Sequence, residues 1–229
     1  VYKRQGTEPK VKLYVNTVAG SAEESSKKAQ GYLDAIAARR SIRAYAKEQI
    51  TSEQLDAILA AGLAAPSARN TQPWHFTAVQ DAALIARVNE AARAQILLTC
   101  PEDMRARIAA PDYSVFHGAP TVIFLSCPPP TQMRYAHTDT GMAIENMTLA
   151  AHSLGLGSVI LGMPREAFAG PEADALRRAL HFPEGYDFCL ALAVGVPTAG
   201  KEAHPVEPDR VTILSLIHIS EPTRLGMIS

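Results

Sequence analysis

Residues 65–76 read Ala-Pro-Ser-Ala-Arg-Asn-Thr-Gln-Pro-Trp-His-Phe. The two prolines exclude a continuous helix here, and the small residues between them let backbone N–H groups come close to a ligand. The side-chain amides of Asn70 and Gln72 each offer a donor and an acceptor, which suits a flat heterocycle with alternating N–H and C=O groups. Residues 66–74, called the proline loop below, are therefore predicted to be ordered and to precede a strand. On these residues alone, a simple turn whose Trp74 fills the core is an equal alternative.

A basic cluster lies before this loop. Apolar residues recur with helical spacing from Tyr32, and the predicted helix runs into Arg-Arg-Ser-Ile-Arg at residues 39–43. Cations at the end of a helix complement its dipole, so the cluster can be a helix cap with a solvated face. It can also bind an anion, because guanidinium groups form bidentate, charge-assisted hydrogen bonds with phosphate. The residues leave both interpretations open.

The remaining pattern predicts short apolar strands that alternate with helices. A helix opened by Thr51-Ser52-Glu53 leads into the proline loop, and a long helix capped by Thr138 or Asp139 runs to about residue 154. Strands are predicted at residues 75–79, 121–126, 159–162 and 188–194, with a further edge strand at 211–213. This order implies a mixed sheet covered by helices. A glycine pair, Gly155 and Gly157, separates the long helix from the third strand.

Composition favours a single domain with a small-molecule ligand. The chain has 229 residues, of which 47% are hydrophobic, and a net charge of -1. It can therefore form one large domain with a full core, or at most two small ones, and its charge favours neither nucleic acid nor an anionic membrane as a partner. No apolar run approaches the roughly 18 residues typical of a membrane span, and the N-terminus lacks a signal-peptide layout, so we expect a cytoplasmic protein.

The cysteines and histidines show no spacing that is typical of a metal site. Cys100, Cys127 and Cys189 are odd in number, far apart and without a CxxC pair, and the seven histidines form no HExxH motif. We therefore expect buried thiols, with no disulfide framework and no metal.

The two ends of the chain differ from the rest. Residues 1–5 and residues 214–229 resemble translated cloning sequence, so we exclude them from the fold. The predicted division is an N-terminal extension over residues 1–30, of unassigned role, one domain over residues 31–213, and a non-native tail over residues 214–229.

Together these stretches resemble the nitroreductase family of FMN flavoproteins, over roughly residues 32–213. Residues 39–45, Arg-Arg-Ser-Ile-Arg-Ala-Tyr, look like its opening motif Arg-Arg-Ser-x-Arg-x-Phe/Tyr. Residues 66–74 carry every fixed element of its motif Pro-Ser-x-x-Asn-x-Gln-Pro-Trp. The resemblance implies an α+β fold with a mixed, mainly antiparallel central sheet of four to five strands. It also implies an intertwined homodimer with the long helix at its core.

The resemblance assigns cofactor-binding residues at both motifs. Arg39, Arg40 and Ser41 are expected to hold the FMN phosphate and ribityl end. Arg43 is expected to reach the flavin pyrimidine, where a cation stabilises the charge of the reduced ring. Four loop residues are expected to contact the flavin that the partner subunit mainly binds, and these are Pro66, Ser67, Ala68 and Asn70.

Two later segments complete the expected FMN site. The backbone N–H groups of Ile160, Leu161 and Gly162 are expected to approach flavin N5 and O4, although an ordinary buried strand is the alternative there. Lys201 and His204 are expected near the phosphate, and Ala203 stands where many relatives carry an arginine.

The expected function follows from the same resemblance. NAD(P)H would give a hydride to FMN N5 and leave, and an electron-poor acceptor such as a nitroaromatic or a quinone would then take its place and be reduced, which is a ping-pong mechanism. The cofactor makes the bonds, so no catalytic acid or base is assigned. The alternatives are dehalogenation, enone reduction, azoline oxidation or flavin fragmentation on the same fold, or a flavin-binding protein without turnover.

Residues 99–118 are the expected cover of the active site and show no clean periodicity. Tyr113, Phe116 and His117 are candidates for its lining, although core packing or surface exposure fits each of them better.

Overall fold

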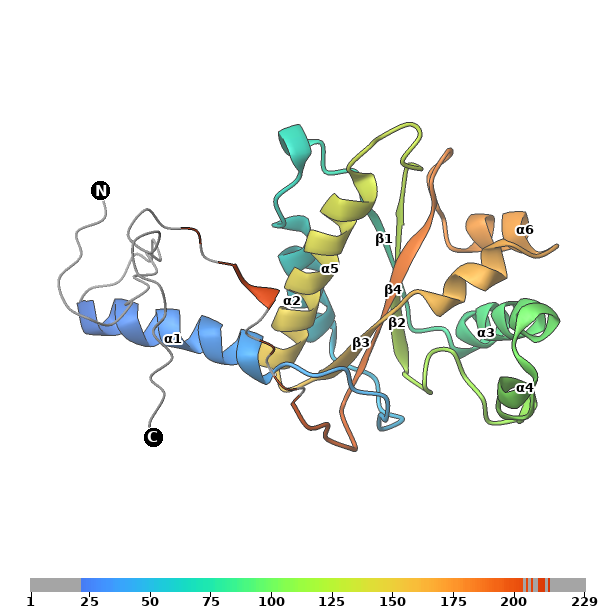
Figure 1. The fold of residues 1–229 in the computed structure, drawn as a ribbon, viewed down its shortest axis with the longest axis horizontal. Helices are drawn as coiled ribbons and strands as arrows, with labels where there is room; N and C mark the ends of the chain where they lie inside the picture. Colours follow the sequence, from blue (N-terminus) through green and yellow to red (C-terminus); the bar gives the residue numbers. More distant parts are fainter. Residues whose placement is uncertain (1–21, 204, 206, 208–209, 213, 215–229) are drawn as a thin grey trace, which may run out of the picture.

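The computed structural model describes residues 22–203, 205, 207, 210–212 and 214. In it, a four-stranded sheet lies between two layers of helices (Figure 1). The helices are α1 (Ala22–Ala38), α2 (Ser52–Leu63), α3 (Ala82–Thr99), α4 (Glu102–Ala109), α5 (Ala136–Ser153) and α6 (Ala173–Ala179), with short 3-10 helices η1 (Ala68–Asn70) and η2 (Met163–Phe168). The strands are β1 (His75–Val79), β2 (Thr121–Cys127), β3 (Gly157–Leu161) and β4 (Asp187–Gly195).

The sheet has the order β1-β2-β4-β3, and its neighbouring strands are antiparallel. An isolated bridge between Ser41 and Ser158 adds one parallel contact at the outer side of β3. The α+β class and the four predicted strands are therefore confirmed. In this chain, Val211 and Thr212 belong to no strand, and the rest of the expected edge strand lies outside the described residues.

Two hydrophobic layers hold the sheet. Side chains alternate along β2, so Val122 and Phe124 pack toward α3, whereas Ile123 and Leu125 pack toward α2 and α5. Both faces of β2 are thus covered, which explains its unbroken apolar sequence. Phe116 is fully buried and packs edge-on against Phe124, with ring centroids 5.7 Å apart. It is therefore a core residue and does not line a pocket.

Helix α1 begins at Ala22, well before the start predicted at Tyr32. Its first turns are polar and have no apolar face for the periodicity to reveal, and an ion pair of 2.8 Å joins Glu24 and Lys28 across one turn. The helix extends away from the body of the chain (Figure 1). The expected boundary at residue 31 falls inside this helix, and the division into extension and domain stays a prediction.

Helix α5 ends in a Schellman motif that directs the chain into β3. The Leu156 N–H donates to the Ala151 carbonyl at 2.9 Å, and the Gly155 N–H donates to the His152 carbonyl at 3.0 Å. Gly155 has a φ of 75°, a left-handed conformation that costs glycine little. The motif places β3 beside the basic cluster at the end of α1.

Across the described part of the chain, no helix is both long and apolar enough to cross a membrane.

Candidate functional site

The basic cluster is fixed against the ends of two strands. The Ile42 N–H donates to the Ser158 carbonyl of β3 at 2.9 Å. The Tyr45 hydroxyl donates to the Ile42 carbonyl at 2.5 Å, and the Ala193 carbonyl oxygen of β4 lies 3.4 Å from the same hydroxyl. Burial raises the pKa of this hydroxyl, so it remains a donor. The backbone after Arg40 therefore has a defined course, and the arginines are held at the edge of the sheet.

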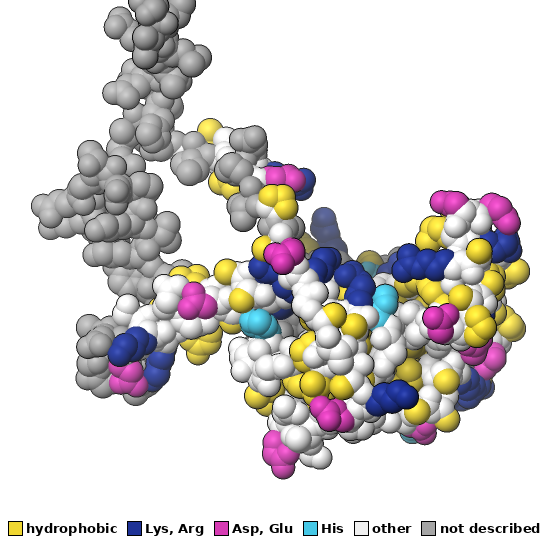
Figure 2. All heavy atoms as spheres, turned by 90° about the horizontal axis from the view of Figure 1, so that it is seen from below, with side chains coloured by type: hydrophobic (Ala, Val, Ile, Leu, Met, Phe, Trp, Pro, Cys, Tyr) yellow, Lys and Arg dark blue, Asp and Glu magenta, His cyan; other side chains and the backbone are white. Residues whose placement is uncertain are grey.

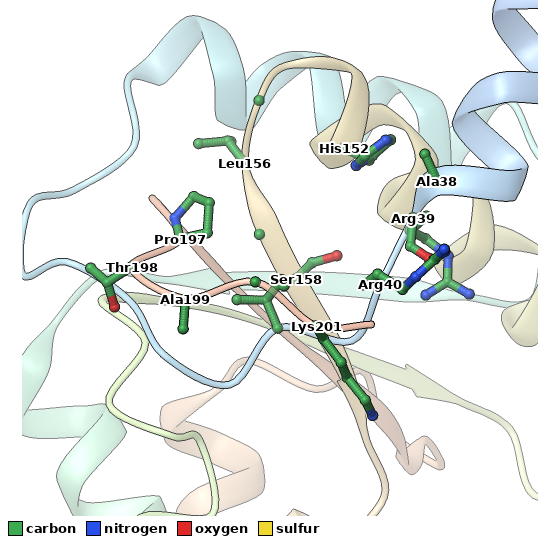
Figure 3. A pocket seen from close by; sticks show the side chains of 14 residues that line it. Ala38, Arg39, Arg40, His152, Leu156, Ser158, Pro197, Thr198, Ala199 and Lys201 are labelled. Carbon is green, nitrogen blue, oxygen red and sulfur yellow. The ribbon is translucent and has the colours of Figure 1, made fainter. Parts of the chain in front are cut away.

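A cleft of about 550 Å³ opens next to this segment (Figure 3). Arg39, Arg40 and Lys201 contribute cationic groups to its lining, and none of the described residues that line it is acidic. Its volume lies in the range of about 300–1,000 Å³ that is usual for ligand pockets. A cleft with these charges is suited to a phosphate or another anion.

The two arginines are already ordered in different ways. The Nε of Arg39 is buried, lies 3.3 Å from Oε1 of Glu145, and has no aligned hydrogen bond. The Nη1 of Arg40 donates to the carbonyls of Ala37 and Arg39, both at 2.7 Å. Arg40 therefore caps the carboxyl end of α1, as the first interpretation of the basic cluster predicts. Capping and anion binding are compatible, because a guanidinium group has five N–H donors.

Ser41 and Arg43 do not line this cleft, although they flank it. Ser41 bridges to Ser158 of β3, and its neighbours Arg40 and Ile42 line the cleft. Arg43 is exposed, and its positive charge acts on His117 from the segment that follows α4. The structure thus brings His117, one of the three candidates from residues 99–118, next to the basic motif.

The pKa of His117 is lowered from 6.5, first by burial and then by the charges of Arg43 and Arg107. We expect Arg43→Ala to raise this pKa, as measured by the titration of histidine ring resonances by NMR. Arg87→Ala is the matched control, because Arg87 pairs with Glu172 and is not among the causes. An unchanged His117 titration in Arg43→Ala would show that the two side chains do not interact.

The same lowered pKa predicts the pH dependence of stability. Above pH 6.5 His117 is neutral in both the folded and the unfolded chain, so it adds no pH dependence to the free energy of unfolding. As the pH falls through 6.5 toward the folded-state pKa, the unfolded chain takes up the proton first, so this group lowers the free energy of unfolding. In His117→Asn we expect a smaller loss of stability across that window in denaturant titrations. Asparagine tolerates the left-handed φ of 55° at this position.

The segment expected at the flavin ring lies on the outer strand of the sheet. Ile160 and Leu161 pair with β4 on one side only, since β3 is the last strand. Gly162 is exposed, and a Cβ added there would meet no atom within 4 Å. None of the three residues lines the cleft of the arginines. Their backbone role at a flavin stays a prediction, and His204 lies outside the described residues.

The proline loop is ordered and backbone-strained. Three of its residues have positive backbone φ angles, which residues other than glycine rarely adopt: 55° at Arg69, 56° at Asn70 and 45° at Gln72. The Ser67 hydroxyl accepts from the Gln72 N–H at 2.9 Å, and the Oδ1 of Asp139 accepts from the Ala68 N–H at 3.1 Å. These bonds hold the loop in shape.

The start and end of the loop differ in burial. Pro66 and Asn70 are exposed, and Ser67 and Ala68 are half-buried, so loop atoms are available to a ligand or a partner. Trp74 is buried and stacks on Phe76, with ring centroids 6.1 Å apart. The core-filling interpretation is therefore confirmed for Trp74, and ligand contacts of the loop stay a prediction.

Within one chain the proline loop and the cleft lie at opposite ends of α5. The loop contacts Asp139 in the first turn of this helix, whereas His152 in its last turn lines the cleft. The intervening helix rises about 1.5 Å per residue, which separates them by roughly 20 Å. A chain does not bring its own loop to its own arginines, so a shared site needs a second chain.

Several residues of the site were not singled out from the sequence. His152, Ser158 and Thr198 line the cleft. Asp139 was expected to cap a helix, but α5 begins at Ala136, and Asp139 is buried and anchors the loop instead. Only the glycine pair pointed to the neighbourhood of Ser158. No local sequence pattern marks His152 or Thr198 as cleft residues, or Asp139 as the anchor of the loop.

Gly157 sets how closely the basic cluster approaches β3. A Cβ at this position would lie 2.8 Å from Cγ2 of Ile42 and 3.0 Å from Cβ of Pro197, and neither atom can easily move. Overpacking of this kind typically costs about 1–3 kcal/mol. We expect Gly157→Ala to lower the denaturation midpoint accordingly and to weaken ligand binding in the cleft. Gly31→Ala, where no atom lies within 4 Å, should keep both properties, and equal losses in both variants would contradict this account.

Comparison with known proteins gives consistent results. A model described as "Nitroreductase family" matches residues 36–196. A protein of Archaeoglobus fulgidus, provisionally named an NADH dehydrogenase/NAD(P)H nitroreductase, is 35% identical over 188 residues, which are 78% of this chain and 95% of that protein. A 5,6-dimethylbenzimidazole synthase of Rhodospirillum rubrum is 28% identical over 178 residues, 73% of this chain and 81% of its own. The crystal structure of a nitroreductase with bound FMN from Desulfitobacterium hafniense superposes with a TM-score of 0.76 at 31% identity, covering 81% of this chain and 98% of that one.

Proposed function

Because the chain belongs to the nitroreductase family, we propose that it is an FMN-dependent oxidoreductase that takes a hydride from NAD(P)H and reduces an electron-poor small molecule. The observation that carries this proposal is the cleft in which Arg39, Arg40 and Lys201 meet without an acidic residue in its described lining. Figure 2 shows Lys and Arg side chains gathered near the centre of the face that is seen from below.

The residues of the cleft fit the phosphate end of FMN. The Nε of Arg39 is buried 3.3 Å from the Glu145 carboxylate, so a phosphate oxygen would bind the other guanidinium N–H groups of this residue. Arg39 and Arg40 can each present two parallel N–H groups, and Lys201 adds a point charge. FMN, when bound, supplies the chemistry of accepting and donating the hydride. The protein binds the cofactor, orients it and sets the charge around it.

The other predicted residues are assigned to the ring. Arg43 would place a cation near the pyrimidine and stabilise negative charge that develops there. The outward backbone groups of Ile160, Leu161 and Gly162 would face the central ring from the free side of β3. The chain needs no acid or base of its own for hydride transfer, and we assign none.

The active protein is proposed to be a homodimer. Tyr32, Leu33 and Ile36 are 61%, 44% and 58% exposed on α1, which places large apolar groups on the surface of a single chain. A second chain would cover such groups and would also bring its proline loop to the cleft. In this arrangement the loop would cover the flavin of the neighbouring subunit, with contacts from Pro66, Ser67, Ala68 and Asn70. A cytoplasmic location is part of the same proposal.

The test is anaerobic half-reaction spectroscopy. The purified protein is expected to be yellow, to lose its flavin colour when NADH or NADPH is added without oxygen, and to regain it when menadione or nitrofurazone follows. Recovery by the acceptor after removal of the nicotinamide supports the ping-pong order. A yellow protein that neither nucleotide bleaches would be a flavin carrier, and a colourless protein that FMN does not reconstitute would contradict the proposal.

Flavin fragmentation is the second candidate reaction, and the similarity to the 5,6-dimethylbenzimidazole synthase favours it. The reduced, FMN-loaded protein should then form 5,6-dimethylbenzimidazole when oxygen is admitted, as detected by mass spectrometry. Acceptor reduction without this product favours the first candidate.

A further inference from the structure

Two cysteines and a histidine meet at the end of the sheet that is remote from the cleft. A ligand nitrogen of His137 and the Sγ atoms of Cys127 and Cys189 all lie within 4.8 Å of one another. Cys127 and Cys189 are buried, and His137 is exposed in the first turn of α5. The last turn of α5, which lines the cleft at His152, is about 20 Å away at roughly 1.5 Å per residue. The cluster is therefore separate from the proposed FMN phosphate site.

A β-bulge brings the two sulfurs together. Cys127 pairs with Asp187, and Ser126 pairs with Phe188, but Leu125 pairs with Leu190, so Cys189 is the extra residue on β4. Side chains normally alternate between the faces of a strand. Here Leu190 and Cys189 follow one another and still belong to one cluster with Cys127 on the side of α5. The bulge thus gives β4 a second inward side chain at the position where Cys127 ends β2.

The surroundings of the two sulfurs are apolar, with few competing charges. Ala136 is buried in the same cluster, and Met133 and Leu190 pack against it. The neighbouring charged groups are Asp187, which acts on Cys127, and Arg165, which acts on Cys189. The Thr140 hydroxyl is also buried here, beside Cys127.

The two thiols are close enough to form a hydrogen bond with each other, and Thr140 lies beside Cys127. A divalent ion bound between the sulfurs would neutralise both thiolates.

We propose that Cys127, Cys189 and His137 bind one thiophilic metal ion of the Zn²⁺ class. Two thiolates and an imidazole are ligands that Zn²⁺ prefers, and three protein ligands leave a fourth position for water or another donor. The exposed His137 gives the ion an entry path, and binding releases the two thiol protons to solvent. Asp139 lies in the same first turn of α5 as His137 and accepts a hydrogen bond from the proline loop. The ion would therefore also stabilise the part of α5 that supports this loop.

The test uses the full FMN-loaded chain, reduced with a phosphine and stripped of metal by a chelator. One equivalent of Co²⁺ should produce thiolate-to-cobalt charge-transfer absorption, and Zn²⁺ should displace it and raise the melting temperature. Cys127→Ser and Cys189→Ser should each lose the absorption. His137→Ala changes an exposed side chain and should weaken Zn²⁺ binding by more than about tenfold, since loss of a residue that only orients a metal ligand already costs about 10–100-fold.

Cys100→Ser is the matched control, because Cys100 is a free cysteine outside the cluster and should leave cobalt binding unchanged. Circular dichroism and flavin content establish that each variant is folded. The proposal would be overturned if the folded, reduced wild type took up no metal. It would also be overturned if Co²⁺ bound without thiolate absorption, or if His137→Ala bound Zn²⁺ as tightly as the wild type. None of these outcomes depends on the reaction that the flavin performs.

Discussion

Replacing Arg39 and Arg40 together by alanine is expected to lower the affinity for FMN by about 10²–10⁴-fold, because each charge-assisted contact contributes about 1.5–3 kcal/mol and 1.4 kcal/mol is a factor of ten. Both guanidinium groups line the same cleft, whose described lining holds no acidic residue, and the Glu145 carboxylate lies 3.3 Å from the Nε of Arg39 outside that lining. The measurement is a titration of the stripped protein with FMN, followed by quenching of flavin fluorescence.

Two further variants give this prediction its controls. Arg87→Ala removes an exposed arginine that pairs with Glu172 and should bind FMN like the wild type. Replacing both cleft arginines by lysine keeps the charge but removes the planar fork, so an intermediate affinity is expected. Arg40 also caps α1, and circular dichroism must show that the alanine variant keeps its helix content. Wild-type FMN affinity in a folded double variant would rule out this cleft as the phosphate site.

Two inactive variants are expected to restore activity when they share a dimer. One carries Arg39→Ala and Arg40→Ala, and the other carries Ser67→Ala and Asn70→Gly in the proline loop. The glycine removes the amide of Asn70 but accepts its φ of 56°. In a mixed dimer one site combines intact arginines with an intact loop, while the other site carries both defects. Random pairing then predicts about a quarter of the wild-type activity, because half of the dimers have one good site.

The measurement is NAD(P)H oxidation with menadione by co-expressed variants that carry different affinity tags. Each variant expressed alone sets the background, and the isolated mixed dimer should exceed it while binding about one FMN per two chains. Mixed dimers that stay at the background would show that the loop and the arginines act within one chain or in separate places. Because α5 separates the loop from the arginines of the same chain, such a result would mean that the loop and the arginines belong to separate sites.

Motifs with a strong local cause were predictable from the sequence. The two prolines set the limits of the loop, the unbroken apolar run of β2 indicated a strand covered on both faces, and the glycine pair marked the end of α5. In each case the feature depends on neighbours in the sequence. The arginine cluster was equally visible, although only the structure shows Arg40 capping α1 at the wall of a cleft that has room for an anion.

Features that depend on distant residues were not predictable. The first turns of α1 have no apolar periodicity, so the helix was expected to begin later. The role of Asp139 depends on a backbone N–H contributed by Ala68, and that of His117 on a charge contributed by Arg43. The cysteine cluster depends on a bulge that re-aims one side chain, and no spacing along the chain encodes it.

Helix α5 connects two places that matter for binding. It lines a chain's own cleft with His152 and supports with Asp139 the loop that, in the proposed dimer, reaches into the neighbour's cleft. In that dimer, a shift of α5 on binding one cofactor would also move the loop over the other. Through this coupling, the first FMN to bind would change the free energy of binding the second. Calorimetric titration of the stripped dimer should accordingly resolve two unequal binding steps.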